Sequence, residues 1–210
     1  MDEAIDAVFA EYHKRAAEES KLQSQVPEEV WLERRDEFLI SVGRDTGALL
    51  NILAKGMKAR TILELGSSYG YSTVWLAEAA RKTGGKLISL EISEKKQEYA
   101  RNMLRKAGLA AHVDFRLGDA RDTIASLDGP FDFVLVDLWK DLYIPCFDLF
   151  YPKLSPGAFV AADNMLRPES YRAGALLYRK HVRSKLDIDS VLLPVGSGVE
   201  LSRYGDILAS

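Results

Sequence analysis

The chain has 210 residues, of which 47% are hydrophobic and 28% are charged, as in ordinary globular domains. Its formal charge of −3 argues against a nucleic-acid or anionic-membrane partner, because such proteins usually carry a basic patch. No apolar run approaches the roughly 18 residues of a membrane span, and no secretory signal pattern is visible at the N-terminus. The single cysteine cannot form an internal disulfide, so we expect a cytoplasmic protein.

The first 55 residues have a helical pattern. Pro27 can end one helix and begin the next, which extends to about residue 55. Gly43 and Gly47 predict a break between residues 41 and 47, either a simple interruption or a lip folded over a ligand. Apolar residues at three- and four-residue spacing predict an amphipathic first helix over residues 1–22; they are Ile5, Val8, Phe9 and Tyr12.

From Thr61 onward, short apolar runs alternate with longer helical segments, which predicts a parallel sheet with helices on both faces. Helix ends are expected at Gly84-Gly85, Gly108 and Pro156-Gly157. After a helix over residues 169–184, a turn at 196–198 predicts a β-hairpin. The seven strand segments read TILEL, KLISLE, HVDFRL, FDFVLVD, GAFVAAD, DIDSVLLPV and GVELSRYG.

Residues 64–72, Glu-Leu-Gly-Ser-Ser-Tyr-Gly-Tyr-Ser, follow the first predicted strand. Glycines there allow a tight turn and a close ligand approach, and the next helix directs free N–H groups toward that ligand. The spacing is neither a dinucleotide nor a triphosphate pattern. Glu64 would repel phosphate and suit a cationic ligand, although the loop could also be a purely structural turn.

Two later strand ends complete this prediction. Glu91 ends the second strand and can accept both hydroxyls of a ribose. The turn Gly118-Asp119-Ala120 follows the third strand and could bind an adenine edge. A nucleoside site without a phosphate-binding motif indicates S-adenosylmethionine, whose sulfonium group is positively charged.

The next two strands end in oxygen-bearing side chains. Asp137, Asp163 and Asn164 together predict a site for a hard cation such as Mg²⁺, although a lone strand-end Asp is as often a helix cap. Lys140 lies nearby in sequence, and a lowered pKa would let it take a proton from a substrate hydroxyl. The alternative for this residue is a solvated surface lysine.

These residues resemble the metal-dependent class I O-methyltransferases, the catechol and caffeoyl-CoA O-methyltransferase family. The resemblance runs over about residues 38–204 and rests on ILELGSSYGYSTVWLA and on FDFVLVDLWKDLY followed by GAFVAADN. The Asp-x-Trp-Lys-Asp-x-Tyr pattern is closer to the catechol enzyme. It implies a Rossmann-like α/β fold with a mostly parallel seven-stranded sheet and a C-terminal antiparallel hairpin. It implies one methyltransferase domain over residues 1–210, with residues 1–55 as a lid on the 56–210 core, and a possible homodimer.

The resemblance also implies a set of site residues. Lys140 would be the general base beside Asp137, and the metal, Mg²⁺ or another cation such as Mn²⁺ or Ca²⁺, would be held by Asp137, Asp163 and Asn164. The small aromatic hydroxyl-bearing substrate would meet Phe38, Ile40, Lys140, Asn164 and Pro168. The cofactor would be bound by Ser41, Val42, Glu64, Gly66, Ser68, Gly70, Tyr71, Ser72, Glu91, Asp119, Ala120, Asp137 and Trp139, with Trp139 against the adenine and Arg121 at its edge.

One departure affects the acceptor. The catechol enzyme has a substrate-orienting acid late in the chain, where this sequence has Val191, and Glu200 does not align with it. The expected activity is Mg²⁺-dependent methyl transfer to a hydroxyl of a catechol-like acceptor. Two alternatives stay open: a methyltransferase for another acceptor class (a single phenol, a hydroxamate or a protein), and a non-catalytic protein that binds the cofactor.

Two remaining features look structural. Cys146 lies in an apolar helical segment with no His nearby in sequence, which favours a buried small hydrophobe over a nucleophile. Lys95 and Lys96 lie between Glu94 and Glu98, which indicates a solvated helix face.

Overall fold

The computed structural model describes residues 2–26, 30 and 34–205. Its seven strands form one sheet in the order β3-β2-β1-β4-β5-β7-β6. Strands β1 to β5 pair in parallel, whereas β7 runs antiparallel to both β5 and β6, which confirms the predicted sheet and hairpin. The strands are β1 (Thr61–Leu65), β2 (Lys86–Glu91), β3 (Val113–Leu117), β4 (Phe131–Val136), β5 (Leu154–Ala162), β6 (Ile188–Leu193) and β7 (Val199–Tyr204).

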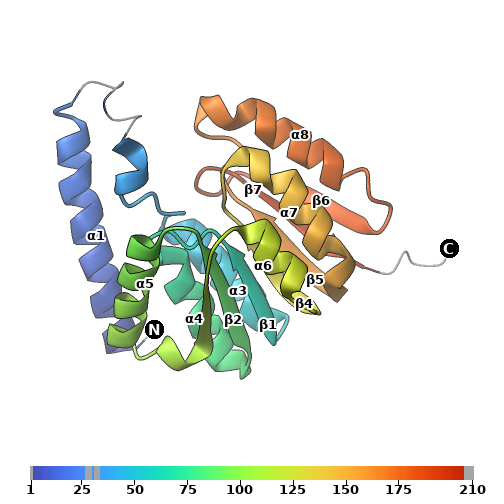
Figure 1. Ribbon diagram of the computed structural model, residues 1–210, viewed down its shortest axis with the longest axis horizontal. Helices are drawn as coiled ribbons and strands as arrows, with labels where there is room; N and C mark the ends of the chain where they lie inside the picture. Colours follow the sequence, from blue (N-terminus) through green and yellow to red (C-terminus); the bar gives the residue numbers. More distant parts are fainter. Residues whose placement is uncertain (1, 27–29, 31–33, 206–210) are drawn as a thin grey trace.

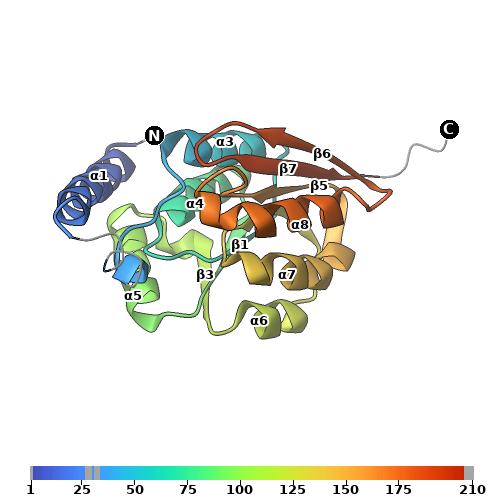
Figure 2. The same cartoon turned by 90° about the horizontal axis from the view of Figure 1, so that it is seen from above.

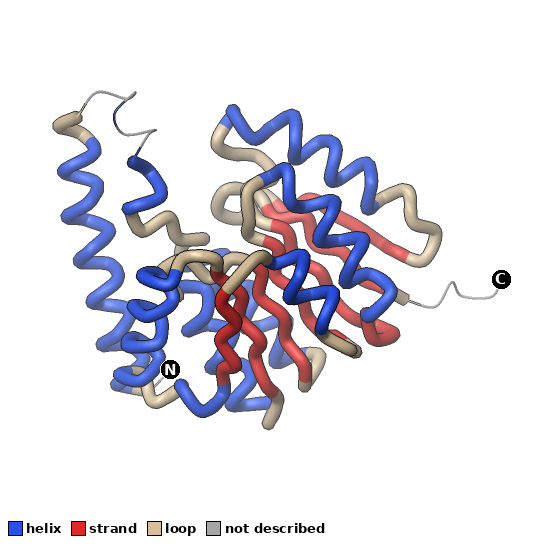
Figure 3. The backbone as a smooth tube through the Cα atoms, in the orientation of Figure 1, coloured by secondary structure: helices blue, strands red, loops and turns tan. Residues whose placement is uncertain are grey.

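Helices cover both faces of this sheet (Figures 1 and 2). One layer contains α3, α4 and α5, with α1 standing outside α5, and the other contains α6, α7 and α8. Figure 3 shows the loops that follow β1, β2 and β4 gathered above the same edge of the sheet. The helices are α1 (Glu3–Gln23), α3 (Arg44–Gly56), α4 (Tyr71–Thr83), α5 (Glu94–Lys106), α6 (Ala120–Ser126), α7 (Tyr143–Phe150) and α8 (Arg172–Val182).

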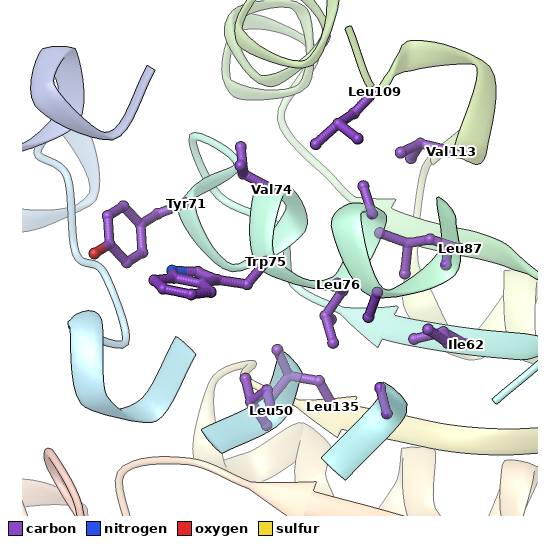
Figure 4. Close-up of a cluster of buried hydrophobic side chains, with 14 of the residues drawn as sticks. Leu50, Ile62, Tyr71, Val74, Trp75, Leu76, Leu87, Leu109, Val113 and Leu135 are labelled. Carbon is purple, nitrogen blue, oxygen red and sulfur yellow. The ribbon is translucent and has the colours of Figure 1, made fainter. Parts of the chain in front are cut away.

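Each sheet face has its own apolar core, because the central strands are buried on both sides. On one face, Leu50 of α3 and Leu76 of α4 pack over Ile62 and Leu135 (Figure 4). The other core includes Cys146, which is fully buried, as the sequence predicted. Burial raises the pKa of its thiol to about 11, so the thiol stays protonated at neutral pH. These two cores hold the strand ends in fixed register.

The break predicted between residues 41 and 47 is confirmed at residues 41–43 but is wrong at Gly47. Helix α3 begins at Arg44 and runs through Gly47 without interruption, while residues 38–43 form the break. An added Cβ at Gly47 would collide with the indole of Trp75, so this glycine allows α3 and α4 to pack closely rather than ending a helix. Gly43 precedes the helix at a φ of 81°, which favours glycine.

The helix end predicted at Pro156-Gly157 is also wrong, because both residues lie inside β5. The β4–β5 register shifts between Phe131 and Phe133, and such an irregularity accommodates a proline within a strand. By contrast, Gly84 ends α4 in the left-handed conformation, as predicted. The predicted role of Pro27 lies outside the described residues. None of the helices within the described ranges is long and apolar enough to cross a membrane.

Candidate active site

The loop after β1 makes a turn that only glycine accommodates at two positions. Gly66 has a φ of 86° and Gly70 a φ of 92°, both in the left-handed region. An added Cβ at Gly66 would collide with the backbone carbonyl oxygen of Asp137, and one at Gly70 would lie 2.6 Å from the Cβ of Ala100. The loop is therefore pressed between the end of β4 and helix α5, immediately before α4 begins.

Glu64 lies beneath this loop and is fully buried. Its carboxylate accepts hydrogen bonds from the hydroxyl groups of Ser72 at 2.7 Å, Thr73 at 2.7 Å and Ser89 at 2.6 Å. Burial raises the pKa of Glu64 to about 7, although the three hydroxyl donors lower it. Glu64 therefore ties the start of α4 to β1 and β2 and carries a titratable proton near neutral pH.

The ends of β2 and β3 hold two further carboxylates. Glu91 accepts backbone N–H groups from Ser68 at 2.8 Å and from the two residues that follow Glu91. Asp119 caps α6 and forms a two-pronged ion pair with Arg121, which lowers the pKa of Asp119 to about 2. Ala120 is buried beside this pair. These residues lie at the predicted strand ends, and their contacts with a nucleoside stay a prediction.

Residues 36–42, which we call the strap, lie over the loop. Residues 39–42 of the strap and the loop together line a cavity with a free volume of about 10 Å³. This is about the volume that one water molecule needs. Ser67 also lines it, and its hydroxyl is buried without a partner among the described residues. Predicted cofactor residues that line this cavity are Ser41, Val42, Ser68, Tyr71, Ser72 and Asp137.

Asp137 and Asp163 are neighbours across the sheet. They directly follow β4 and β5, where Val136 pairs with Ala162, and the Asp163 amide donates to the Val136 carbonyl oxygen at 3.1 Å. Asp163 is 1% exposed, and its Oδ1 atom has no partner among the described groups. A buried carboxylate oxygen without a partner is costly, so this atom fits a ligand that supplies positive charge.

Asn164 comes next in the chain and has a φ of 57°, a left-handed conformation that Asn tolerates better than most residues. Among the described residues, no three His, Cys, Asp or Glu side chains gather closely enough to hold a metal ion. The predicted set has two carboxylates and one amide, so its third oxygen would have to come from Asn164. Carboxylate and amide oxygens suit Mg²⁺ and Ca²⁺.

The side chain of Lys140 lies beside the residues at the ends of β4 and β5. Its Nζ atom donates to the backbone carbonyl oxygen of Asp163 at 3.0 Å, and the Tyr143 hydroxyl donates to the same oxygen at 3.1 Å. The ammonium group also lies 3.6 Å from the Tyr143 ring centroid. Lys140 is therefore directed at the strand ends and is not a solvated surface residue.

Burial shifts the pKa values of all three groups toward their neutral forms. The pKa of Lys140 falls to about 8, because burial outweighs the nearby charges of Asp137 and Asp163. Burial also raises the pKa of both carboxyl groups, and the charge of Asp137 raises that of Asp163 further. Adjacent buried groups with shifted pKa values are typical of functional sites.

Trp139 and most of the apolar residues predicted to contact the acceptor are exposed. Trp139 is 41% exposed, whereas the side chain of its neighbour Leu138 would lie 3.1 Å from a Cβ at Gly66. Sequence reasoning missed Leu138, and its position directly after Asp137 was the available signal. Phe38 is partly buried, and Ile40 and Pro168 are exposed, so their contacts with an acceptor stay predictions.

Glu200 is fully buried, and its carboxylate accepts hydrogen bonds from three side chains. Arg179 and Arg183 of the α8 region donate to its carboxylate at 3.0 and 2.6 Å, and Ser190 donates at 2.7 Å. Val191 is 50% exposed on the edge strand β6. The carboxylate of Glu200 is thus occupied by groups from α8 and β6, although the residue pairs across the sheet with Ala162, which directly precedes Asp163.

A family model described as O-methyltransferase matches residues 13–204. The chain belongs to the O-methyltransferase family. One relative of this family member is a catechol O-methyltransferase from Niastella koreensis, 39% identical over 132 residues, which cover 61% of this chain and 59% of that relative. The chain thus spans about three fifths of that relative. A caffeoyl-CoA O-methyltransferase 2 from Eucalyptus globulus is 31% identical over 186 residues, 79% of this chain and 75% of that one.

The family fold extends to solved structures. The O-methyltransferase TomG of Streptomyces achromogenes, involved in tomaymycin synthesis and solved in complex with SAM, superposes with a TM-score of 0.75 at 27% identity. The superposition covers 98% of this chain and 91% of TomG. The likeness to TomG therefore extends over α1 and the strap as well as over the α/β core.

Proposed function

We propose that the chain transfers a methyl group from S-adenosylmethionine to a hydroxyl of a small catechol-like acceptor, with the help of a divalent cation. One observation carries this proposal. The buried carboxylate of Asp163, which has an unpartnered oxygen, and the partly buried carboxylate of Asp137 stand at adjacent strand ends beside Lys140. The same strand end presses its Asp137 carbonyl oxygen against the cofactor loop at Gly66, so cation and cofactor would be neighbours.

The proposed cofactor pocket fits a cationic nucleoside. Ser67 and Asp137 line it, the first with an unpartnered hydroxyl and the second with a carboxylate, and Glu91 stands at the end of β2. The first turn of α4, at Tyr71, directs free N–H groups toward the loop. When bound, S-adenosylmethionine supplies an electrophilic methyl group on a positively charged sulfur, and S-adenosylhomocysteine leaves as a neutral thioether.

Asp137, Asp163 and Asn164 would hold the cation, which we propose to be Mg²⁺, with Mn²⁺ or Ca²⁺ as other candidates. The cation, when bound, lowers the pKa of an acceptor hydroxyl. Lys140 would accept the proton of that hydroxyl, because burial brings its pKa to about 8 and so leaves a useful fraction neutral. Tyr143 and the Asp163 carbonyl oxygen fix the position of the amine, which is the positioning that such a reaction needs.

An aromatic acceptor is supported by the relatives and by the strap. The relatives described above are named for catechol and for caffeoyl-CoA, both aromatic hydroxyl compounds. We propose Phe38, Ile40 and Pro168 as the apolar walls for the ring, with Asn164 and Lys140 at its hydroxyl edge. The homodimer and the cytoplasmic location stay predictions.

The test is release of S-adenosylhomocysteine from purified protein with S-adenosylmethionine and a panel of catechols and single phenols. Each acceptor is assayed with Mg²⁺ and with EDTA. We expect turnover of catechols alone, loss in EDTA, and a fall in kcat of about 10²–10⁴-fold in Lys140→Met. As a matched control, Lys153→Met removes a lysine that is bound to backbone carbonyl oxygens of α6 and the residue after it and should keep kcat. EDTA-resistant turnover would contradict the role of the cation.

A further inference from the structure

The strap is tied to α1, to the loop after β1 and to α5, and the tie from α1 lies outside the cofactor pocket. The Glu19 carboxylate accepts the backbone N–H of Leu39 at 2.6 Å. Leu39 is a strap residue that lines the cavity, two positions before Ser41. Glu19 thus fixes the strap just before the segment that covers the cofactor pocket.

The other carboxylate oxygen of Glu19 has a separate partner. The Nε atom of Arg15 binds it at 2.6 Å, one helical turn earlier on α1. Both side chains are mostly buried, with 21% and 17% of their surface exposed, so solvent screens this pair less than an open surface pair. Arg15 therefore orients the carboxylate so that its second oxygen meets the Leu39 amide.

Arg15 also contacts the opposite wall of the pocket. Its guanidinium group lies 3.8 Å from the ring centroid of Tyr69, and Tyr69 belongs to the loop after β1. The hydroxyl of Tyr12, another α1 residue, donates to the Tyr69 carbonyl oxygen at 2.6 Å. The Tyr69 hydroxyl in turn donates to the Glu37 carbonyl oxygen of the strap at 2.8 Å. One face of α1 thus holds both walls of the cavity.

Lys96 of α5 adds a tie at the start of the strap. Its side chain is buried and forms an ion pair with Asp36, so the solvated helix face predicted for this segment is wrong at Lys96. The free cavity volume of about 10 Å³ is far below the roughly 300–1,000 Å³ typical of ligand pockets. Part of the cavity wall must therefore move to admit a cofactor, and these ties oppose movement of the strap.

From these contacts we infer that Glu19, oriented by Arg15, is a positioning residue for the cofactor that sets how readily the strap opens. The inference rests on the proposed function, because it takes the cavity to be the cofactor pocket. Glu19 does not line that cavity, so it acts through Leu39 and the strap. Its loss should speed cofactor release and leave the group around Lys140 intact.

The experiment measures S-adenosylhomocysteine binding in wild type, Glu19→Ala and Glu19→Gln, with the dissociation constant from calorimetry and the release rate from stopped-flow displacement. In Glu19→Ala we expect release to be about 5–30-fold faster, which is the effect of losing one charge-assisted hydrogen bond. Glu19→Gln keeps one oxygen for the Leu39 amide but turns its NH2 group toward Arg15, so its release rate should lie between those of wild type and Glu19→Ala. Hydrogen exchange of the peptide that contains Leu39 should rise most in Glu19→Ala.

Glu11→Ala is the matched control. Glu11 also lies on α1 and forms an ion pair with Lys106 at 2.6 Å, but within the described part of the chain it has no hydrogen bond or ion pair with the strap. Equal release rates in Glu19→Ala and Glu11→Ala would overturn the inference, since the effect would then follow from loosening α1 as a whole. Failure of the wild type to bind S-adenosylhomocysteine would instead contradict the proposed function, so the two failures are distinguishable.

Discussion

Gly174 of α8 lies directly against the side chain of Lys140. A Cβ at this glycine would be 2.8 Å from the Lys140 Cβ and 3.6 Å from its Cγ, so the absence of a side chain allows the helix to pack over the lysine. Real Cβ atoms do not approach so closely, and the contact is with the stem of the lysine and not with its flexible end. Any larger residue must therefore displace either α8 or Lys140.

We therefore expect Gly174→Ala to lower kcat by about 10–100-fold, because small displacements of a catalytic group carry costs of this size. The melting temperature should change little, because the gain of about 1 kcal/mol in helix propensity offsets part of the roughly 1–3 kcal/mol that overpacking costs. The measurement is kcat beside thermal unfolding. Gly56→Ala is the control, since Gly56 also lies in a helix and an added Cβ there meets nothing within 4 Å. An unchanged kcat in Gly174→Ala would contradict the proposed role of Lys140.

Ser67 gives a second prediction, from its unpartnered hydroxyl in the cavity. Ser67→Ala removes no protein hydrogen bond, so the free energy of unfolding should stay within about 0.5 kcal/mol of wild type. If the hydroxyl serves the cofactor, the dissociation constant for S-adenosylhomocysteine should rise about fivefold. Calorimetry with the ligand and urea unfolding without it measure the two effects.

Ser72→Ala is the comparison for this prediction. The Ser72 hydroxyl donates to Glu64 at 2.7 Å, so its loss should lower the free energy of unfolding by about 1 kcal/mol. A similar loss of stability in Ser67→Ala would show that its hydroxyl has a protein partner after all. Unchanged ligand affinity would remove Ser67 from the proposed pocket.

Glu64 predicts a specific dependence of stability on pH. Its pKa is raised from 4.5 to about 7 in the folded chain, chiefly by burial. The folded state therefore holds this proton more tightly than the unfolded state, so the stabilisation is present below pH 4.5 and is lost as the pH rises through 7. Glu64→Gln has no such proton, so relative to wild type its free energy of unfolding should rise between pH 5 and 8, by about 3 kcal/mol at most.

Urea unfolding of the ligand-free proteins at pH 5, 6, 7 and 8 measures this difference. Comparison at each pH cancels much of the contribution of other titrating groups, which both proteins share. A difference between the variant and wild type that does not vary with pH would show that Glu64 ionises normally in the folded chain.

Glu200 should be important for stability but not for cofactor binding. Glu200→Ala leaves Arg179 and Arg183 without their buried carboxylate. Because these arginines are partly exposed, we expect a loss of about 3 kcal/mol, at the lower end for broken buried pairs. S-adenosylhomocysteine affinity at 20 °C should not change.

Glu169→Ala is the matched surface variant for this prediction. Its ion pair with Arg172 has the same length, 3.0 Å, as that of Arg179 with Glu200, but both side chains are largely exposed. Exposed pairs contribute about 0–1 kcal/mol. Equal losses in the two variants would contradict the structural role assigned to Glu200.

Most of the sheet follows from the sequence pattern, and so does the placement of Asp137 and Asp163 at adjacent strand ends. Continuous apolar runs separated by helical segments permit few other arrangements. The errors came from glycine and proline. At Gly47 the sequence predicts a helix break, whereas this glycine allows Trp75 to pack closely; at Pro156 it predicts a helix end, whereas the proline lies in β5. In the sequence, a glycine that ends a helix looks the same as one that allows two helices to pack closely. The difference depends on which element lies beside the glycine in the folded chain.

The sequence alone determined which residues follow each strand, because chain connectivity places the carboxyl ends of parallel strands at one edge. It thereby determined the order of the candidate cofactor loop, the two aspartates and Lys140. Only the tertiary structure decided their partners: the Asp163 carbonyl oxygen that receives Lys140, the arginines that occupy Glu200, and the Glu19 carboxylate that holds Leu39. Hydrogen bonds depend on atomic approach between segments distant in the chain, and hydrophobic periodicity contains no information about that approach.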